Sequence, residues 1–213
     1  RKGIKFHDGE ILNAQSVKFS FDRAVWIAKE KGGSAAGNIR TQLSEVTTND
    51  ADQTVTLSLN DPFAPFLKSF YQVAIMSEKT VMAHESDGDW GTEWLETNDA
   101  GSGPYKVAER QVGSFIRTER FDGYWGGWPD NHYDTAIYKK YADQASAFTA
   151  IVNKEGALTD KWFAVETYKK FEKEPTLDVH WTDDVFVFYI LMNNQLGRNP
   201  GEPEYNSWRD AGE

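Results

Sequence analysis

Helical and strand-like hydrophobic periods alternate along this chain of 213 residues. Residues Thr54–Leu59 switch strictly between polar and apolar side chains, which predicts a strand with one buried face. Upstream of it, apolar residues recur at helical spacing after Asn13, which predicts a helix that this residue caps and that Gly32 and Gly33 end. Because the two periods interleave, the pattern indicates an α/β or mixed α+β fold.

The middle of the chain continues this alternation. Asp61-Pro62 suits the start of a short helix. Its inner face is expected to carry four apolar side chains, Phe63, Phe66, Leu67 and Phe70. Next, residues 105–109 and 115–120 are predicted to form a hairpin whose turn lies at 111–114.

Further elements are predicted in the last third. A strand at 135–141 precedes two helices, the second of which ends before Pro175. The residues expected to face inward are Ala145, Phe148, Ile151 and Val152 in the first helix, and Val165, Tyr168 and Phe171 in the second. Residues Leu177, Val179 and Trp181 alternate as a strand would, and the apolar run VFVFYILM at 185–192 is typical of a strand covered on both faces.

Charge and composition exclude several classes of partner and chemistry. Thirty-three acidic residues against 23 basic ones give a net charge of −10, which disfavours nucleic acid and anionic membranes as main partners. The absence of cysteine excludes disulfides, thiolate metal sites and cysteine nucleophiles. No apolar run approaches the roughly 20 residues that span a bilayer. The composition therefore indicates a globular protein whose main partner is not a polyanion.

Motifs for catalysis or metal binding are absent or weak. Nucleotide, serine-hydrolase and zinc-protease signatures are missing, and the four histidines are widely scattered. The acidic stretch at 85–89 lacks the spacing of a calcium loop, so a solvated turn is the simpler interpretation. A carboxylate pair for glycoside hydrolysis depends on separation in space and stays open, because acidic residues occur along the whole chain.

Three ordered segments resemble the extracellular solute-binding proteins of family 5, the dipeptide- and oligopeptide-binding proteins of ABC transporters. The first is RKGIKFHDGE at 1–10, followed by NAQSVKFSF at 13–21. The second is GSGPYKV at 101–107, which continues to a Tyr-Trp pair at 124–125, and the third is FYILMNNQ at 188–195. Their order and separations cover nearly the whole chain, which makes the resemblance specific although each segment alone is only moderately so.

The resemblance implies a type II periplasmic-binding-protein fold, in which two lobes enclose a cleft. The chain is then expected to be a fragment that holds most of lobe I and the start of lobe II. By this analogy, residues 1–98 form an accessory α/β subdomain of lobe I and residues 99–182 much of its central sheet. Residues 183–213 would form the crossover strand and the truncated start of lobe II. The Gly-Pro-Tyr strand and the Tyr-Trp pair would belong to the scaffold of lobe I.

Ligand contacts implied by the resemblance fall late in the chain. Where family members often carry a Gly-Glu-Ile-Asp segment, this chain has EGALTDKWF at 155–163, which differs in spacing and residue type and leaves peptide specificity open. The expected ligand-binding residues are Asp160, Trp162 and Phe163 in that segment, with Phe186 and Phe188 on the crossover strand. Trp162 could stack on a sugar ring or an apolar side chain, and Asp160 could hold an ammonium or hydroxyl group. For the three phenylalanines, core packing is the alternative.

The function implied by the resemblance is that of an extracytoplasmic solute receptor. Such a protein captures a peptide-like or other small solute and delivers it to the membrane permease of an ABC transporter, without catalysis, cofactor or metal. It would be a monomer in the periplasm or outside the cell. In its full-length form, a lipid could anchor it to the membrane. Two alternatives stay open: a carbohydrate-active hydrolase with two carboxylates and tryptophan platforms, and an extracytoplasmic sensor or chaperone on the same scaffold.

Overall fold

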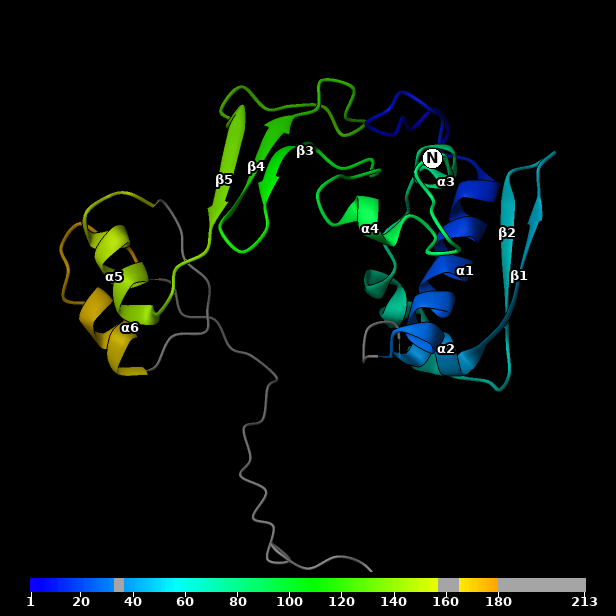
Figure 1. Ribbon diagram of the computed structural model, residues 1–213, viewed down its shortest axis with the longest axis horizontal. Coiled ribbons are helices and arrows are strands. Elements are labelled where there is room, and N and C mark those ends of the chain that lie inside the picture. The colour runs from blue at the N-terminus through cyan, green and yellow to red at the C-terminus, as the bar shows by residue number, and fades with distance from the viewer. Residues whose placement is uncertain (33–36, 157–164, 180–213) are drawn as a thin grey trace, which may run out of the picture. The chain divides into compact units, whose positions relative to one another are not determined.

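The computed structural model describes residues 1–32, 37–156 and 165–179 (Figure 1). Helices and strands alternate along them, which confirms the predicted mixed class. By its internal contacts the chain divides into two units, Arg1–Ala147 and Phe148–Glu213. Within the described residues, no helix has both the length and the apolar character needed to cross a bilayer.

Helix α1, Ala14–Glu30, begins and ends where the sequence predicts. The Asn13 side chain accepts a hydrogen bond from the Ser16 backbone N–H at 2.9 Å. In return, the Ser16 hydroxyl accepts one from the Asn13 backbone N–H at 2.9 Å, which completes a capping box. At the other end, Gly32 follows the cap residue Lys31 with φ +67°, a conformation that glycine adopts without strain.

Removing this cap should weaken the first unit measurably. We expect Asn13→Ala to lower the free energy of unfolding of the full-length protein by about 1 kcal/mol, because the Ser16 backbone N–H loses its side-chain partner. Asn13→Ser is the matched control, since serine also caps helices and should restore most of the loss. Urea unfolding of the three proteins measures the difference, and equal losses in both variants would contradict a capping role.

A two-stranded hairpin packs beside α1. Strand β1, Leu43–Asn49, pairs antiparallel with β2, Thr54–Leu59, and the short helix α2, Gly37–Gln42, leads into it. The predicted strand β2 is confirmed. No sequence signal predicted β1, because only Leu43 and Val46 of its seven residues are buried and their spacing of three is not the strand period. A register shift between Leu43 and Glu45 accounts for that spacing.

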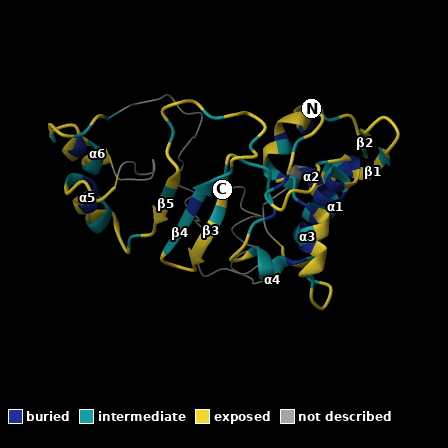
Figure 2. Cartoon of the chain, turned by 90° about the horizontal axis from the view of Figure 1, so that it is seen from above, coloured by how far each residue is buried: buried dark blue, intermediate teal, exposed yellow. Residues whose placement is uncertain are grey.

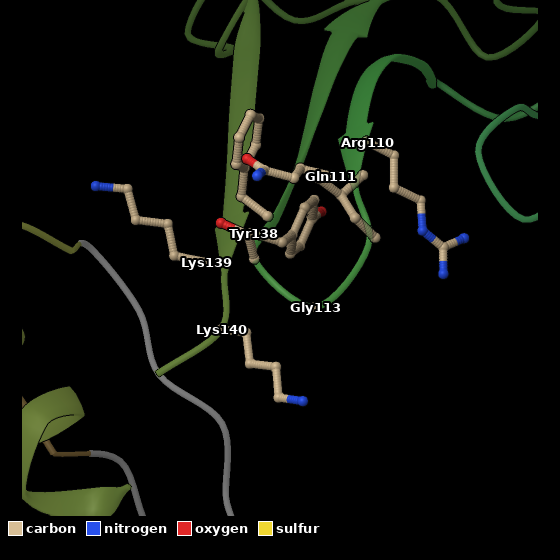
Figure 3. A pocket seen from close by; sticks show the side chains of 9 residues that line it. Arg110, Gln111, Gly113, Tyr138, Lys139 and Lys140 are labelled. Atoms are coloured by element: carbon tan, nitrogen blue, oxygen red, sulfur yellow. The ribbon is translucent and has the colours of Figure 1, made fainter. Parts of the chain in front are cut away.

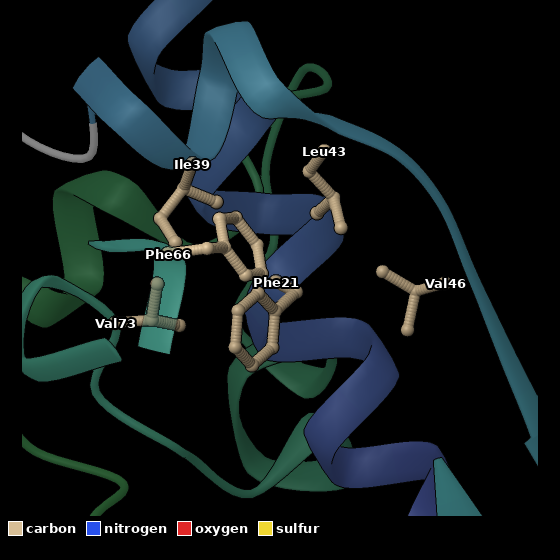
Figure 4. Packing of buried hydrophobic residues seen from close by; sticks show 6 residues of the cluster. All are labelled: Phe21, Ile39, Leu43, Val46, Phe66 and Val73. Atoms are coloured by element: carbon tan, nitrogen blue, oxygen red, sulfur yellow. The ribbon is translucent and has the colours of Figure 1, made fainter. Parts of the chain in front are cut away.

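The main hydrophobic core forms where α1, α2 and β1 meet the segment at 63–73 (Figure 4). Its buried members come from distant parts of the sequence: Phe21, Ile39, Leu43, Val46, Phe66 and Val73. A second cluster lies on another side of α1 and contains Phe19, Val81 and Ala100. Figure 2 shows that the buried residues concentrate around α1 and the elements that contact it. Helix α1 is therefore buried on more than the single face that its periodicity predicts.

The helix predicted after Pro62 is a 3-10 helix, Ala64–Gln72, with Phe63 rather than Asp61 at its start. The predicted inner face of this helix is partly wrong, because a 3-10 helix has fewer residues per turn than an α-helix. Three residues per turn align 63, 66 and 69, so Phe66 and Ser69 are buried. Leu67, which an α-helix would have placed inward, is 73% exposed.

Two short helices, α3 at Glu78–Ala83 and α4 at Thr92–Leu95, follow before the three-stranded sheet. The sheet has the order β3-β4-β5 and is antiparallel throughout. Its strands are Tyr105–Gln111, Phe115–Arg120 and Thr135–Lys139, close to the predicted ranges. The predicted hairpin and the strand that follows it are thus confirmed.

The last described elements are α5, Gln144–Val152, within which the unit boundary falls, and α6, Val165–Phe171. The Phe148 and Phe171 rings lie 4.8 Å apart, in agreement with their predicted inward positions. Val165, however, is 58% exposed. Positions six apart on an α-helix are rotated by about 120°, so Val165 and Phe171 cannot share one narrow face.

The end of the chain is only partly covered by the described residues. Residues 177–179 belong to neither a helix nor a strand, so the strand predicted through Leu177 and Val179 is not found there. A strand belongs to a sheet, and the two sheets of the described residues are built from β1 and β2 and from β3, β4 and β5. Trp181 and the apolar run at 185–192 lie outside the described residues.

Candidate functional site

All five predicted ligand-binding residues lie outside the described residues. They are Asp160, Trp162, Phe163, Phe186 and Phe188, in the ranges 157–164 and 180–213. Their role therefore stays a prediction. The described residues do bring together the first two of the three sequence segments that carry the family resemblance.

The two segments meet at a motif junction, which we define as the turn at 5–11 and the loop at 99–107, whose last three residues are the first three of β3. An isolated bridge joins Lys5 to Ile11, and the Gly9 N–H closes the turn on the Phe6 carbonyl at 3.0 Å. The His7 backbone N–H then donates to the Gly101 carbonyl at 2.8 Å, so the turn lies against the loop that enters β3.

At the centre of the motif junction, the His7 ring contacts two oxygen atoms. Its Nδ1 pairs with the Asp99 carboxylate, and its Nε2 lies 3.0 Å from the Gly103 carbonyl oxygen. The His7 side chain is only 10% exposed and that of Asp99 24%. The Phe121 ring packs edge-on against His7 at 4.9 Å. Asp99 also accepts hydrogen bonds from the backbone N–H groups of Gly101 at 3.2 Å and Val107 at 2.5 Å.

These contacts shift the pKa values of both partners. Burial alone would lower the pKa of His7, but the hydrogen bonds to Asp99 and Gly103 outweigh it, so the pKa is raised above its ordinary value. Burial likewise would raise the pKa of Asp99, yet the hydrogen bonds from His7 and the Val107 N–H outweigh it and the pKa is lowered. Both shifts favour the charged pair.

The pair does not have the geometry of a catalytic dyad. In a Ser-His-Asp triad the carboxylate holds one ring nitrogen while the other accepts the proton of a nucleophile. Here the second nitrogen of His7 faces the backbone carbonyl of Gly103, which has no proton to give. The arrangement joins two segments and activates no hydroxyl group.

A second carboxylate extends the motif junction to α3. Asp8 accepts hydrogen bonds from the hydroxyl groups of Ser77, at 2.6 Å, and Thr80, and from the Glu10 backbone N–H at 2.9 Å. Burial would raise the pKa of Asp8, but the hydrogen bonds from Ser77 and Thr80 outweigh it and the pKa is lowered. Ser77 also caps α3, so the Asp8 contact fixes the start of that helix.

The aromatic residues after β4 form a packed cluster. The Trp128 ring contacts Tyr105 at 5.2 Å, Tyr124 at 6.0 Å and His132 at 5.0 Å. Its indole N–H donates to the Phe121 carbonyl at 3.0 Å, which satisfies the one donor of this half-buried side chain. Tyr124 thus packs among other rings, as a scaffold residue would, whereas Trp125 is 44% exposed and lies under the Arg1 guanidinium, 4.2 Å from Arg1 Cζ. The scaffold role of the Tyr-Trp pair stays a prediction.

Several of the described carboxylates form ion pairs or accept hydrogen bonds from backbone N–H groups. Asp122 and Asp134 line one surface hollow, and both contact the Arg120 guanidinium, at 2.9 and 3.3 Å. The Asp89 carboxylate accepts backbone hydrogen bonds from Ser86, Gly91 and Glu93. Within the described residues, no three His, Asp or Glu side chains are arranged to hold a metal ion. The stretch at 85–89 is therefore built as a self-capped turn.

A second hollow, of about 260 Å³, lies at the tip of the β3–β4 hairpin beside the end of β5 (Figure 3). The basic residues Arg110, Lys139 and Lys140 are among its lining residues, and Tyr138 contributes an exposed ring. No carboxylate is among the lining residues, so this hollow cannot supply the two carboxyl groups of a glycoside hydrolase.

Sequence reasoning missed the His7–Asp99 pair. The two residues are 92 positions apart, and neither spacing nor periodicity connects them. The one available signal was that each lies in or beside a segment that resembles the same family. Two such segments can be expected to meet in space, but the sequence does not say which side chains join them.

Comparisons with known proteins identify the family of the chain. The family model described as bacterial extracellular solute-binding proteins, family 5 Middle, matches residues 1–206. The dipeptide-binding protein of Escherichia coli (strain K12) is 33% identical over 171 residues, which cover 73% of this chain and 31% of that protein.

Two solved structures share the fold, each with 25% identity over 82% of this chain and 33% of theirs. The oligopeptide-binding protein AppA from Bacillus subtilis, in complex with a nonapeptide, has a TM-score of 0.62. AgaA from A. tumefaciens R10, in complex with agropinic acid, has a TM-score of 0.65. The chain thus spans about a third of the length of these relatives and has part of a type II periplasmic-binding-protein fold. By the family match over residues 1–206, it belongs to the bacterial extracellular solute-binding proteins of family 5.

Proposed function

We propose that the full-length protein is the solute-binding component of an ABC transporter, which captures a peptide-like solute outside the cytoplasm and delivers it to a membrane permease. The observation that carries this proposal is the family match over residues 1–206. The relatives point to the ligand class: two are named for dipeptides and oligopeptides, and a third was solved with agropinic acid.

The mechanism we propose is binding without chemistry. Two lobes that close on a solute exclude water and so strengthen its polar contacts, and the closed shape signals occupancy to the permease. Residues 1–98 and 99–182 would belong to lobe I and residues 183–213 to the start of lobe II. The His7–Asp99 pair fits binding without chemistry, because it joins two segments of the chain and its second ring nitrogen faces a backbone carbonyl and not a nucleophile. We further propose a periplasmic or extracellular monomer, with a lipid anchor as an option for the full-length protein.

Native mass spectrometry of the full-length protein, purified from its own host, tests the proposed function. We expect an unmodified solute bound noncovalently at about one-to-one stoichiometry. Calorimetric titration with dipeptides and longer peptides then ranks candidate ligands. Turnover of a glycan or peptide by the purified protein, lost on substitution of a single carboxylate, would overturn the proposal in favour of an enzyme.

The proposed ligand contacts can be tested once a solute is known. We expect Trp162→Ala and Asp160→Asn each to weaken binding about tenfold or more, because a buried stacking contact or charged hydrogen bond contributes at least about 1.4 kcal/mol. Tyr133→Ala is the control, since this ring is also large but highly exposed outside the proposed segment. Unchanged affinity in both site variants would place the cleft elsewhere. The same test applies to Phe163, Phe186 and Phe188.

A further inference from the structure

The contacts of His7 depend on the protonation of its ring. A neutral imidazole has one N–H donor and one bare nitrogen, whereas the protonated ring donates from both nitrogens. Both partners of His7, the Asp99 carboxylate and the Gly103 carbonyl, are acceptors. Only the protonated ring can donate to both, and loss of a proton leaves a bare nitrogen against an oxygen atom.

We propose that His7 and Asp99 form a pH-sensitive latch, which holds the turn at 5–11 against the loop at 99–107 when the ring is doubly protonated and loosens when the ring releases a proton to solvent. Two backbone amides, those of His7 and Val107, form hydrogen bonds at the same contact. The His7 N–H bonds to Gly101 and the Val107 N–H bonds to Asp99, so both amides depend on the same contact surface. The loop leads directly into β3, which makes the latch a link between the N-terminal turn and the sheet.

The charges around the ring set the direction of the pH response. Asp99 favours the protonated ring, while Lys106 on β3 opposes it, and Phe121 contributes an uncharged ring. Because the pKa of His7 is raised on folding, its stabilisation is complete below the ordinary value of about 6.5 and is lost as the pH rises through the folded value. For Asp99 the pKa is lowered, so its contribution is present above about 3.9 and is lost in acid. The latch is therefore strongest between about pH 4 and 6.5.

Imidazole nitrogen spectra of the full-length protein test the latch directly. We expect His7 to carry protons on both nitrogens at pH 6 and to titrate at higher pH in the folded protein than in the urea-unfolded chain. Asp99→Asn should lower the His7 midpoint relative to wild type. A His7 ring that is neutral at pH 6, or that titrates no higher in the folded protein than in the unfolded chain, would overturn the proposal.

Amide hydrogen exchange tests whether deprotonation of His7 loosens the contact between the two segments or leaves that contact unchanged. The exchange rates are first corrected for the intrinsic rate of each amide. The protection factors of the His7 and Val107 amides should then fall as the pH rises past the His7 midpoint. The fall should be about tenfold for each pH unit between the His7 midpoints of the folded and unfolded protein. In His7→Gln this pH dependence should vanish, while His84→Gln should keep it. The Thr47 amide in β1 is the internal reference. Protection of His7 and Val107 that stays constant across pH 5–9 in wild type would also overturn the latch.

Discussion

Phe21→Ala should lower the free energy of unfolding of the full-length protein by about 3–5 kcal/mol. Phe21 is 3% exposed and lies in the main core cluster, where Figure 4 shows its side chain among those of Ile39, Leu43 and Phe66. Its ring also meets Phe70 edge-on at 5.3 Å. Alanine would remove the ring and leave a cavity between elements that cannot all move inward together.

Leu67→Ala is the matched control for this prediction. Leucine 67 is also a large apolar residue of the same unit, but it is 73% exposed, so its truncation should change the free energy of unfolding by less than about 0.5 kcal/mol. Urea unfolding followed by tryptophan fluorescence measures both variants. Similar losses at the two positions would show that the 63–73 segment is an α-helix with Leu67 inward, as its sequence alone suggested.

Local signals made part of the fold predictable. Helix α1 and strand β2 were found because their boundaries depend on neighbours in the sequence, such as the Asn13 capping box or the strict alternation at 54–59. The hairpin of β3 and β4 was found for the same reason, since its turn contains Gly113 with φ +79°. In each case the determining contacts lie within a few residues.

Elements defined by distant contacts were missed or misjudged. Strand β1 exists because it pairs with β2 and packs on α1, and its own residues show no strand period. The segment at 64–72 was recognised as helical, but its 3-10 pitch, which decides that Leu67 faces solvent, was not. Periodicity predicts the type of an element better than its partners.

The candidate site shows the same division between local and distant information. The family resemblance located the two segments at 1–10 and 101–107, yet only the folded chain shows that His7 and Asp99 join them. The predicted ligand contacts from Asp160 to Phe188 derive from the resemblance alone, because ligand contacts across a cleft depend on how two lobes close. They are therefore testable only in the full-length protein.

Gly91→Ala is the second substitution expected to have a large effect. Gly91 has φ +66°, which L-residues rarely adopt, and an added Cβ would lie 2.7 Å from Val81 Cγ1 and 2.9 Å from the Val81 carbonyl oxygen. Val81 is fully buried in the second core cluster and cannot retreat without disturbing Phe19 and Ala100. Backbone strain of about 1 kcal/mol and overpacking of about 1–3 kcal/mol should together cost about 2–4 kcal/mol.

Gly113→Ala separates these two contributions. Gly113 also has a positive φ, +79°, but a Cβ there would meet no atom within 4 Å. Its substitution should therefore show only the backbone strain, about 1 kcal/mol. The difference between the two variants in urea unfolding then measures the contact with Val81. If Gly91→Ala costs no more than Gly113→Ala, the turn at 86–91 moves freely away from α3, and the second core cluster does not depend on it. If the predicted gap is found, a glycine is required at position 91 because the backbone passes too close to Val81 for any side chain.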